Sequence, residues 1–440
     1  MIQLHLLILE WKHFTKNPFK ILAFLLFIVA GIYGMHNGAA LYHKQITEIN
    51  KLRKKAEEQE QKIINFYNKG EKGPADRPWI DVTTPFWAIW NLPTYAFKVP
   101  SASMVYCIGQ TEQYGFYKQI SVWASAQDAD LTNEIANPER LQSGNLDFSF
   151  VLLYLSPVLL LLVCYNIKTT ENEQGFLQLI QLQVININTW LANRLLFYFL
   201  VTLLSIIILL LYGAILTPVF TEASNVFGWF LLYSVVYIFL WITGFYYILK
   251  YSKAVVGAAL KMIASWLIIC FLIPAAVHQT ISIAKPANLM LDFIDVQRDG
   301  REKIFNQPDS VIDKQLIQLF PNLRKTKLFT DTAQRIMLRN YSGSALAYNL
   351  LNKTLVETEK VNNQKNKLVK QLYWLNPISF FQNQLNKTTQ THYDNYKKYR
   401  DDIDRLIQKR IEVMVMDIWD GKTITKTDFL TYKEQLSFLP

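Results

Sequence analysis

The segment Gly421-Lys422-Thr423 contains residue types that bind nucleotide phosphates. In a phosphate-binding loop, the lysine contacts the phosphates and the hydroxyl that follows contacts Mg²⁺. That loop also needs a glycine five residues before Gly421, and the chain has Met416 at this position. We therefore interpret the segment as an ordinary turn.

A group of carboxylates partly matches a calcium-binding loop. Asp128 and Asp130 take its first and third positions, and Glu139 takes its twelfth. The sixth position needs a glycine for a sharp turn, but the chain has Asn133 there, and Pro138 interrupts the segment. We interpret these residues as solvated loop carboxylates.

The histidines and cysteines do not form a metal-binding pattern, because the sequence contains no His-Glu-x-x-His and no Cys-x-x-Cys. His36 and His43 lie seven residues apart on one helical face, where they could meet a metal or a lipid headgroup; we interpret them as polar anchors at a membrane interface. Cys164 and Cys270 fall in apolar runs, and Cys107 is expected to be exposed outside them. We predict no disulfide framework, no metal and no cofactor in this chain.

The elements that position these residues are dominated by five apolar runs, each long enough to cross a bilayer core of about 30 Å as a helix. They cover residues 21–42, 148–167, 195–216, 226–249 and 254–277. The chain also carries 11 Trp, 23 Tyr and 27 Phe, a heavy aromatic content for a soluble protein of 440 residues. The sequence therefore predicts an all-α polytopic membrane protein with five transmembrane helices.

Two residues within these runs stand out. Lys261 is their single charge, and we expect its ammonium group to reach the nearby membrane surface. Pro157 removes a backbone hydrogen bond from the second run and is predicted to kink it. Because no acidic residue lies within the runs, a proton relay is not expected.

Basic residues near the runs predict the orientation of the chain. They lie at Lys12, Lys16, Lys20, Lys168, Arg194, Lys250 and Lys253, whereas the connection at 217–226 has none. Residues 1–20 are therefore expected to form a cytoplasmic interfacial helix anchored by Trp11, with a plain N-terminal extension of the first span as the alternative, and residues 168–194 are expected to be cytoplasmic. The first run is too long for the apolar part of a signal peptide, so we expect it to be retained.

The remaining segments, 43–147 and 278–440, are predicted to form two mainly helical extracytoplasmic domains. Helical patterns cover residues 45–67, 329–372 and 388–419, with breaks at 70–78 and at Asn376-Pro377. Residues 79–123, rich in aromatics, proline, serine and threonine, are expected to form an irregular cap. The formal charge of +10 is attributed to these surfaces and the cytoplasmic loops, so no nucleic-acid partner is predicted.

The cytoplasmic stretch ENEQGFLQLI, residues 171–180, interrupts the apolar region. Glu171 and Glu173 favour the start of a helix, and Gly175 permits a bend. The apolar side chains that follow are Phe176, Leu177, Leu179 and Ile180. This composition fits a short helix that docks into a groove on another protein, and it equally fits a plain interfacial loop helix.

The pattern Glu171-x-Glu173-x-Gly175-x-Leu177, followed by Asn188-Thr189-Trp190-Leu191 and Arg194, resembles the coupling segment of type-2 ATP-binding-cassette (ABC) permeases. The stretches TPFWAIWNLPTYAFKVPS, Gln110 to Tyr117 and NPERLQSGNLDFSF are similar to a bacterial subgroup that includes permeases for gliding motility and copper-enzyme maturation. Such permeases usually have six transmembrane helices. Since no sixth run follows Val277, that helix is expected either after Pro440 or to have been lost.

The resemblance implies a membrane subunit of an exporter in the bacterial inner membrane, paired with a second permease as a homodimer or a paralogous heterodimer. A separate cytoplasmic ATPase dimer would bind ATP and Mg²⁺, and this chain would not itself be an enzyme. The expected coupling residues are Glu171, Glu173, Gly175, Phe176, Leu177 and Ile180.

The alternative is a non-transporting mechanotransmission or assembly protein of an envelope machine. The large share of the chain expected outside the cytoplasm favours this alternative. A periplasmic partner is possible in either case. A membrane-embedded enzyme is disfavoured, because the sequence shows no convergent polar constellation in or beside the runs. Low His, Met and Cys content in the extracytoplasmic segments argues against a copper-handling surface, although Met414 and Met416 leave that alternative open.

Overall fold

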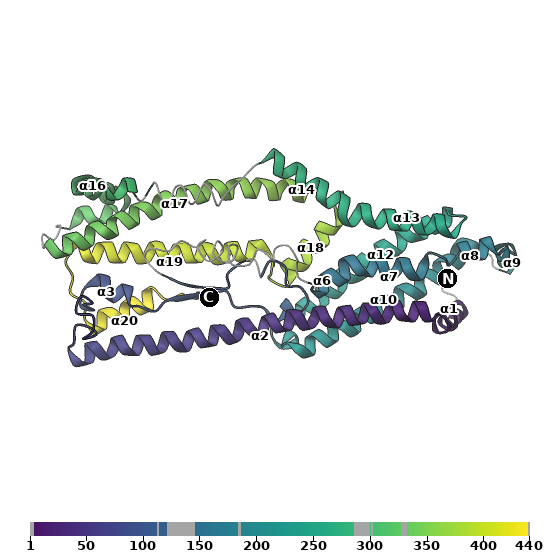
Figure 1. Ribbon diagram of the computed structural model, residues 1–440, viewed down its shortest axis with the longest axis horizontal. Helices are drawn as coiled ribbons and strands as arrows, with labels where there is room; N and C mark the ends of the chain where they lie inside the picture. Colours follow the sequence, from purple (N-terminus) through teal and green to yellow (C-terminus); the bar gives the residue numbers. More distant parts are fainter. Residues whose placement is uncertain are drawn as a thin grey trace.

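The computed structural model describes residues 4–111, 114–120, 146–183, 186–285, 300, 302–326 and 332–438. The molecule is elongated, with a layer of apolar helices at one end and a second helical body at the other (Figure 1). The helix α2, Pro18–Lys69, runs through both parts without interruption. We call the two parts the spanning layer and the extramembrane body.

Five helical stretches in the described residues are long and apolar enough to cross a membrane. They are α2, the stretch Phe148–Glu173, α10 (Ile187–Leu216), α12 (Ser224–Tyr251) and the stretch Val255–Ala284. The second contains α6 (Phe148–Phe150), η2 (Val151–Leu155), α7 (Ser156–Cys164) and α8 (Thr169–Glu173). The fifth contains α13 (Val255–Leu267), η3 (Ile268–Leu272) and α14 (Ile273–Ala284). The predicted all-α chain with five long apolar helices is confirmed, and these helices fit a multi-pass membrane protein.

Two glycines allow α2 to pack directly on the backbone of neighbouring segments. A Cβ atom at Gly34 would lie 2.8 Å from the carbonyl carbon of Asp147, and one at Gly38 would lie 2.7 Å from the carbonyl oxygen of Val105. Both separations are shorter than carbon contacts allow, so a larger residue at Gly34 would push α2 away from the start of the second span, and one at Gly38 would push it away from Val105.

The extramembrane body is built from both long segments that flank the spans. The first contributes α3 (Pro85–Trp90), β1 (Tyr95–Phe97), η1 (Ala102–Val105) and β2 (Tyr117–Gln119), and the short α11 (Val219–Glu222) lies between two spans. The second contributes α16 (Asp309–Leu319), η4 (Pro321–Lys325), α17 (Thr332–Gln371), α18 (Pro377–Thr388), α19 (Tyr393–Trp419) and α20 (Lys426–Gln435). The strands β1 and β2 form an antiparallel pair in which Tyr95 lies opposite Gln119.

The two segments, expected as separate domains, share one hydrophobic core. Val82 and Ile89 from the first segment belong to the same buried cluster as Ile403 and Ile418 from the second. Arg410, only 1% exposed, reaches from α19 and donates a hydrogen bond of 3.0 Å to the carbonyl of Leu92. The extramembrane body is therefore one packed unit.

The expected exposure of Cys107 is wrong. It lies outside the spans, as predicted, but it is fully buried rather than exposed. Its thiol donates to Asn386 Oδ1 at 2.8 Å, and burial raises the pKa of the thiol well above its usual value. A thiol held neutral in this way is a structural residue and a poor nucleophile.

The second span widens into a π-turn, η2, directly before Pro157. Because proline lacks an N–H, nearby carbonyls need other donors. The carbonyl of Leu152 accepts from Ser156 Oγ at 2.5 Å, and the carbonyl of Leu153 accepts from the Tyr237 hydroxyl of α12 at 2.5 Å. The structure thus places Pro157 beside a π-turn whose backbone groups are satisfied by side chains.

Candidate functional site

The stretch predicted to be a coupling segment forms two short helices joined by a bend. The helix α8 is followed by a turn at Gly175 and then by α9, Phe176–Gln183. Gly175 has a φ of 77°, in the left-handed region where glycine carries no steric penalty. The bend that the glycine suggested is therefore present. Both helices lie at the end of the spanning layer farthest from the extramembrane body, close to α1, Leu4–Lys16 (Figure 1). We call this the connecting end.

Glu173 and Asn172 attach α8 to the start of the fifth span. Glu173 Oε1 accepts a hydrogen bond of 2.7 Å from the Val255 N–H, one of the N–H groups that the first turn of α13 leaves without a helical partner. Asn172 Nδ2 donates to the carbonyl of Lys253 at 2.9 Å. The carboxylate also complements the positive end of the helix dipole. Two hydrogen bonds thus join α8 directly to the start of α13.

Lys168 attaches the same segment to the end of the fourth span. Its ammonium group donates to the carbonyls of Leu249 and Lys250 at 3.1 and 2.5 Å. Both carbonyls lie in the last turn of α12, where a helix lacks internal donors and where a positive charge is favoured.

Arg194 connects the coupling segment with the N-terminal helix. Its Nε–H donates to Glu10 Oε1, and its Nη1–H groups donate to the carbonyl of Ile167 at 3.0 Å and to Glu171 Oε1 at 3.4 Å. The Arg194 side chain is 11% exposed and that of Glu10 is 1% exposed. Arg194 is therefore the ion-pair partner of a deeply buried carboxylate, and removing one member of such a pair is costly.

Two further residues complete the group. The Tyr198 hydroxyl donates to Glu10 Oε2 at 3.1 Å, and the Lys20 ammonium donates to the Tyr198 oxygen at 2.7 Å. We call the five residues Glu10, Lys20, Glu171, Arg194 and Tyr198 the polar node. It joins α1, α2, α8 and α10 at one point.

Glu10 was not among the residues predicted from the sequence, although its position in the sequence is unusual. Glu10 is the only acidic residue before Glu48, in a segment that is otherwise apolar and basic. A lone carboxylate in such a segment predicts a buried partner, but nothing local indicates that the partner is Arg194.

The helix α9 divides the expected coupling residues between two faces. Leu177 and Ile180 are partly buried and pack against the core of the spanning layer. Phe176, Leu179 and Leu182 follow one another at intervals of three residues and are 50, 57 and 85% exposed. We call these three residues the α9 surface. It is an apolar face on a short helix that the described part of the chain leaves exposed.

The other candidate residues have structural partners. Gly421 ends α19 with a φ of 68°, and Lys422 Nζ lies 3.2 Å from Asp428 and 3.6 Å from Asp417, as in an ordinary surface turn. Lys261 Nζ approaches Ser252 Oγ at 3.5 Å, consistent with the expected reach toward the α12–α13 connection.

His36 and His43 are not brought together at a metal. The His36 Nε2 atom pairs with the Tyr212 hydroxyl at 2.6 Å, and the His43 Nε2 atom with the Leu216 carbonyl at 3.1 Å. Each histidine thus joins α2 to α10. Within the described ranges there is no group of three His, Cys, Asp or Glu residues placed to hold a metal ion. The carboxylates Asp128, Asp130 and Glu139 lie outside the described residues.

Comparison of the chain with known protein families, with curated proteins and with solved structures found no match.

Proposed function

We infer that the chain is a membrane subunit of a bacterial ABC exporter, driven by a separate cytoplasmic ATPase. The observation that supports this best is the construction of the connecting end. One short segment presents the α9 surface outward and is bonded to α13 through Glu173 and to α12 through Lys168. A protein that moves against α9 would therefore act on several spans at once.

The polar node extends this arrangement. Glu171 and Glu10 share Arg194, so a shift of α8 changes the surroundings of a buried carboxylate on α1. Buried charged groups tolerate few geometries, because each must keep its partner when water is excluded. The node therefore favours a small number of discrete arrangements, which is what a transmission element needs.

The resemblance of the sequence to type-2 permeases supplies the remaining parts of the proposal. The α9 surface would dock on an ATPase dimer that holds ATP and Mg²⁺, and a second permease, identical or paralogous, would complete the transporter. The connecting end would face the cytoplasm of the bacterial inner membrane, and the extramembrane body would lie in the periplasm. The chain itself would carry no catalytic site.

Purification from native membranes tests the docking step. We expect a stoichiometric ATPase to co-purify with the chain, and Phe176→Asp with Leu179→Asp to reduce its recovery at least tenfold, because two charges would be buried in the interface. The matched control is Ile336→Asp with Val356→Asp, two side chains of α17 that are 59 and 61% exposed. Equal recovery of the ATPase with both double variants would refute docking at α9.

A second variant separates docking from transmission. Glu171→Gln leaves the α9 surface intact but removes one of the two carboxylate charges that face Arg194. We expect the ATPase to remain bound while the response of its activity to reconstitution with the permease falls several-fold. An unchanged response would remove the polar node from the transmission path.

Mechanotransmission without transport remains a second candidate because of α2. This helix of 52 residues passes from the spanning layer into the extramembrane body with no break. At 1.5 Å per residue it is about 78 Å long, more than twice the thickness of a bilayer core. A straight rod of this kind would carry movement from the membrane to a distant partner. Recovery of an envelope protein with the extramembrane body, together with the ATPase, would favour this reading.

A further inference from the structure

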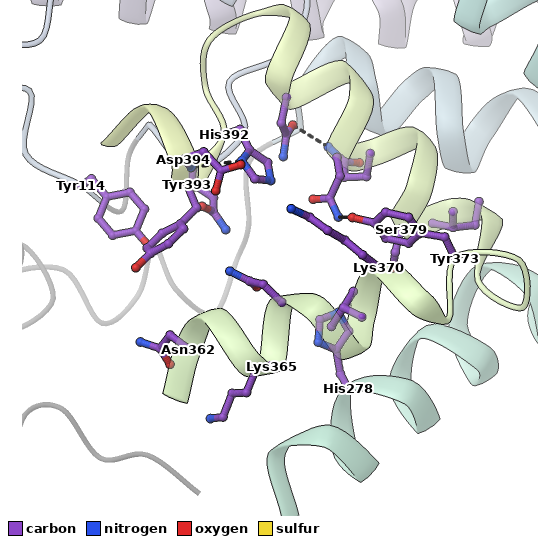
Figure 2. Close-up of a pocket in the computed structure, with 18 of the residues that line it drawn as sticks. Tyr114, His278, Asn362, Lys365, Lys370, Tyr373, Ser379, His392, Tyr393 and Asp394 are labelled. Atoms are coloured by element: carbon purple, nitrogen blue, oxygen red, sulfur yellow. Dashed lines mark hydrogen bonds and ion pairs between the residues drawn. The ribbon is translucent and has the colours of Figure 1, made fainter. Parts of the chain in front are cut away.

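A polar cavity of about 620 Å³ lies where the extramembrane body meets the spans. Its walls come from α17, from α18, from the residues around His392 and from the end of the fifth span at His278 (Figure 2). Amide and hydroxyl groups line it, among them Asn362, Asn383 and Tyr373. These groups can both donate and accept hydrogen bonds, so the cavity suits a ligand rich in oxygen.

Lys370 gives this cavity its charge. Its side chain extends from α17 into the cavity, whereas Lys365 lies at the edge (Figure 2). Within the described residues, no carboxylate lies at ion-pair distance from Lys370. Asp394, the acidic residue of the lining, faces His392 at 3.4 Å. Lys370 remains exposed to solvent, so its ammonium group favours an anion through screened charge attraction and not as a buried, unpaired ion.

An apolar groove of about 140 Å³ lies on an adjacent face of α18. Phe381 and Pro377 form its α18 wall, and Trp241 and Gly244 of α12 and Ile269 of the fifth span form the others. Phe381 is anchored against the Tyr237 ring, with the ring centroids 5.0 Å apart. Pockets for compact ligands usually measure about 300 to 1,000 Å³, so this groove is a slot for a slender chain.

The two spaces share α18 and the fifth span. The distance between them along that span is close to the reach of a lipid acyl chain. Ile269 lines the groove and His278 lines the cavity, nine residues apart on the same span. At 1.5 Å per residue this is about 14 Å, close to half of the roughly 30 Å hydrocarbon core. One acyl chain has that reach when its headgroup lies at the membrane surface.

We propose that this pair of spaces binds one anionic phospholipid from the leaflet next to the extramembrane body. The headgroup occupies the polar cavity, where Lys370 contacts its phosphate. One acyl chain passes along α18 and occupies the apolar groove beside Gly244. Lipid binding requires neither an ATPase nor transport, so it holds or fails independently of the proposed function.

Gly244 allows a direct test of the chain site. A Cβ atom at Gly244 would meet nothing within 4 Å, so a side chain can begin there without a backbone clash, and Gly244→Leu adds bulk at the groove that Gly244 lines. Gly228 lies on the same helix, has equally open surroundings and is not part of the groove. Both substitutions raise helix propensity by the same amount, so Gly228→Leu is the matched control.

Native mass spectrometry of the isolated chain, exchanged into detergent with phosphatidylglycerol or phosphatidylcholine, measures retention. We expect the unmodified chain and Gly228→Leu to retain one phosphatidylglycerol, at least fivefold more than phosphatidylcholine. Gly244→Leu should lower retention of phosphatidylglycerol at least fivefold. Equal retention by the two glycine variants would overturn the proposal.

The charge of the site is tested on α17. Lys370→Gln should abolish the preference for phosphatidylglycerol, whereas Lys367→Gln, an exposed position outside the cavity, should preserve it. An equal loss in both variants would show general electrostatic attraction and refute the site. Competition with glycerol 3-phosphate is the last measurement. If it displaces the lipid at equal concentration, the cavity binds a free anion and the proposed acyl-chain site in the groove is refuted.

Discussion

The two ends of the spanning layer hold the same helices by different means. At the connecting end, the polar node uses charged groups, with Arg194 shared between Glu10 and Glu171. At the opposite end, which we call the junction, η2 is bonded to α12 and to the fifth span through neutral groups, and α18 packs on α12. There the Tyr237 hydroxyl donates to the Leu153 carbonyl, and the Trp266 Nε1–H donates to the Tyr154 carbonyl at 3.2 Å.

This difference has mechanical consequences. Ion pairs act over several ångströms, and a shared arginine can move toward either of two carboxylates. A hydroxyl bonded to a backbone carbonyl beside a proline has one geometry, because Pro157 fixes the local backbone and offers no N–H. The connecting end is therefore suited to rearrangement, and the junction is suited to keep its shape.

The largest effect is expected at the connecting end. Arg194→Ala leaves Glu10, 1% exposed, without its charge partner, and should lower the free energy of unfolding by about 3 to 5 kcal/mol. Titration with a denaturing detergent in mixed micelles measures this change. Arg324→Ala, at an exposed position, is the control. A similarly small loss in both variants would show that the polar node does not hold the connecting end.

A smaller effect is expected at the junction. Tyr237→Phe keeps the ring that packs on Phe381 but removes the donor to the Leu153 carbonyl, at a cost of about 1 to 3 kcal/mol. The same titration measures it, with Tyr247→Phe on the exposed face of α12 as the control. If Tyr237→Phe exceeded Arg194→Ala, the junction and not the connecting end would depend most on its polar contacts.

The smallest effect concerns pH at the edge of the junction. Lys98 donates to the Gln390 carbonyl at 3.1 Å, just after α18, and burial lowers its pKa to about 8. The folded chain then loses this proton near pH 8, whereas the unfolded chain keeps it until near 10.5. Folding is therefore favoured as pH rises between these values.

Thermal unfolding measured from pH 7 to pH 10 tests this prediction. The Tm of the unmodified chain should rise by about 1 °C relative to that of Lys98→Met, while Lys62→Met on the exposed face of α2 should follow the unmodified chain. An opposite slope would mean that Lys98 is charged and paired in the folded chain.

Local pattern predicted much of the fold. Five long apolar runs require helices because a bilayer satisfies no backbone group, and Asn376-Pro377 predicted the boundary between α17 and α18. The Asn376 side chain accepts from the Ser379 N–H at 3.2 Å as a helix cap, which is a local interaction. The bend at Gly175 was predictable for the same reason.

Features that depend on distant residues were not predictable. Arg194 and Glu10 are separated by 184 positions, and no periodicity or spacing joins them. The core shared by residues near Val82 and Ile403 likewise requires the path of the whole chain. Pro157 indicated a disturbed helix, but the hydrogen bond that the widened turn accepts from Tyr237 comes from another span and could not be seen in the local sequence.

The shared core of the extramembrane body also sets an order for its biogenesis. Residues such as Ile89 and Ala96 are fully buried in the finished protein, partly by residues from Ile312 onward. A ribosome adds about 5 to 20 residues per second, so the roughly 215 residues between these segments take about 10 to 40 s to synthesise. During that interval the first half of the core has been made and its second half has not, while the four spans from the second to the fifth are synthesised one after another. The apolar, aromatic-rich surface of the first segment therefore stays uncovered until the second segment has been made. A truncated chain that ends after the fifth span should aggregate or recruit a chaperone on that side of the membrane.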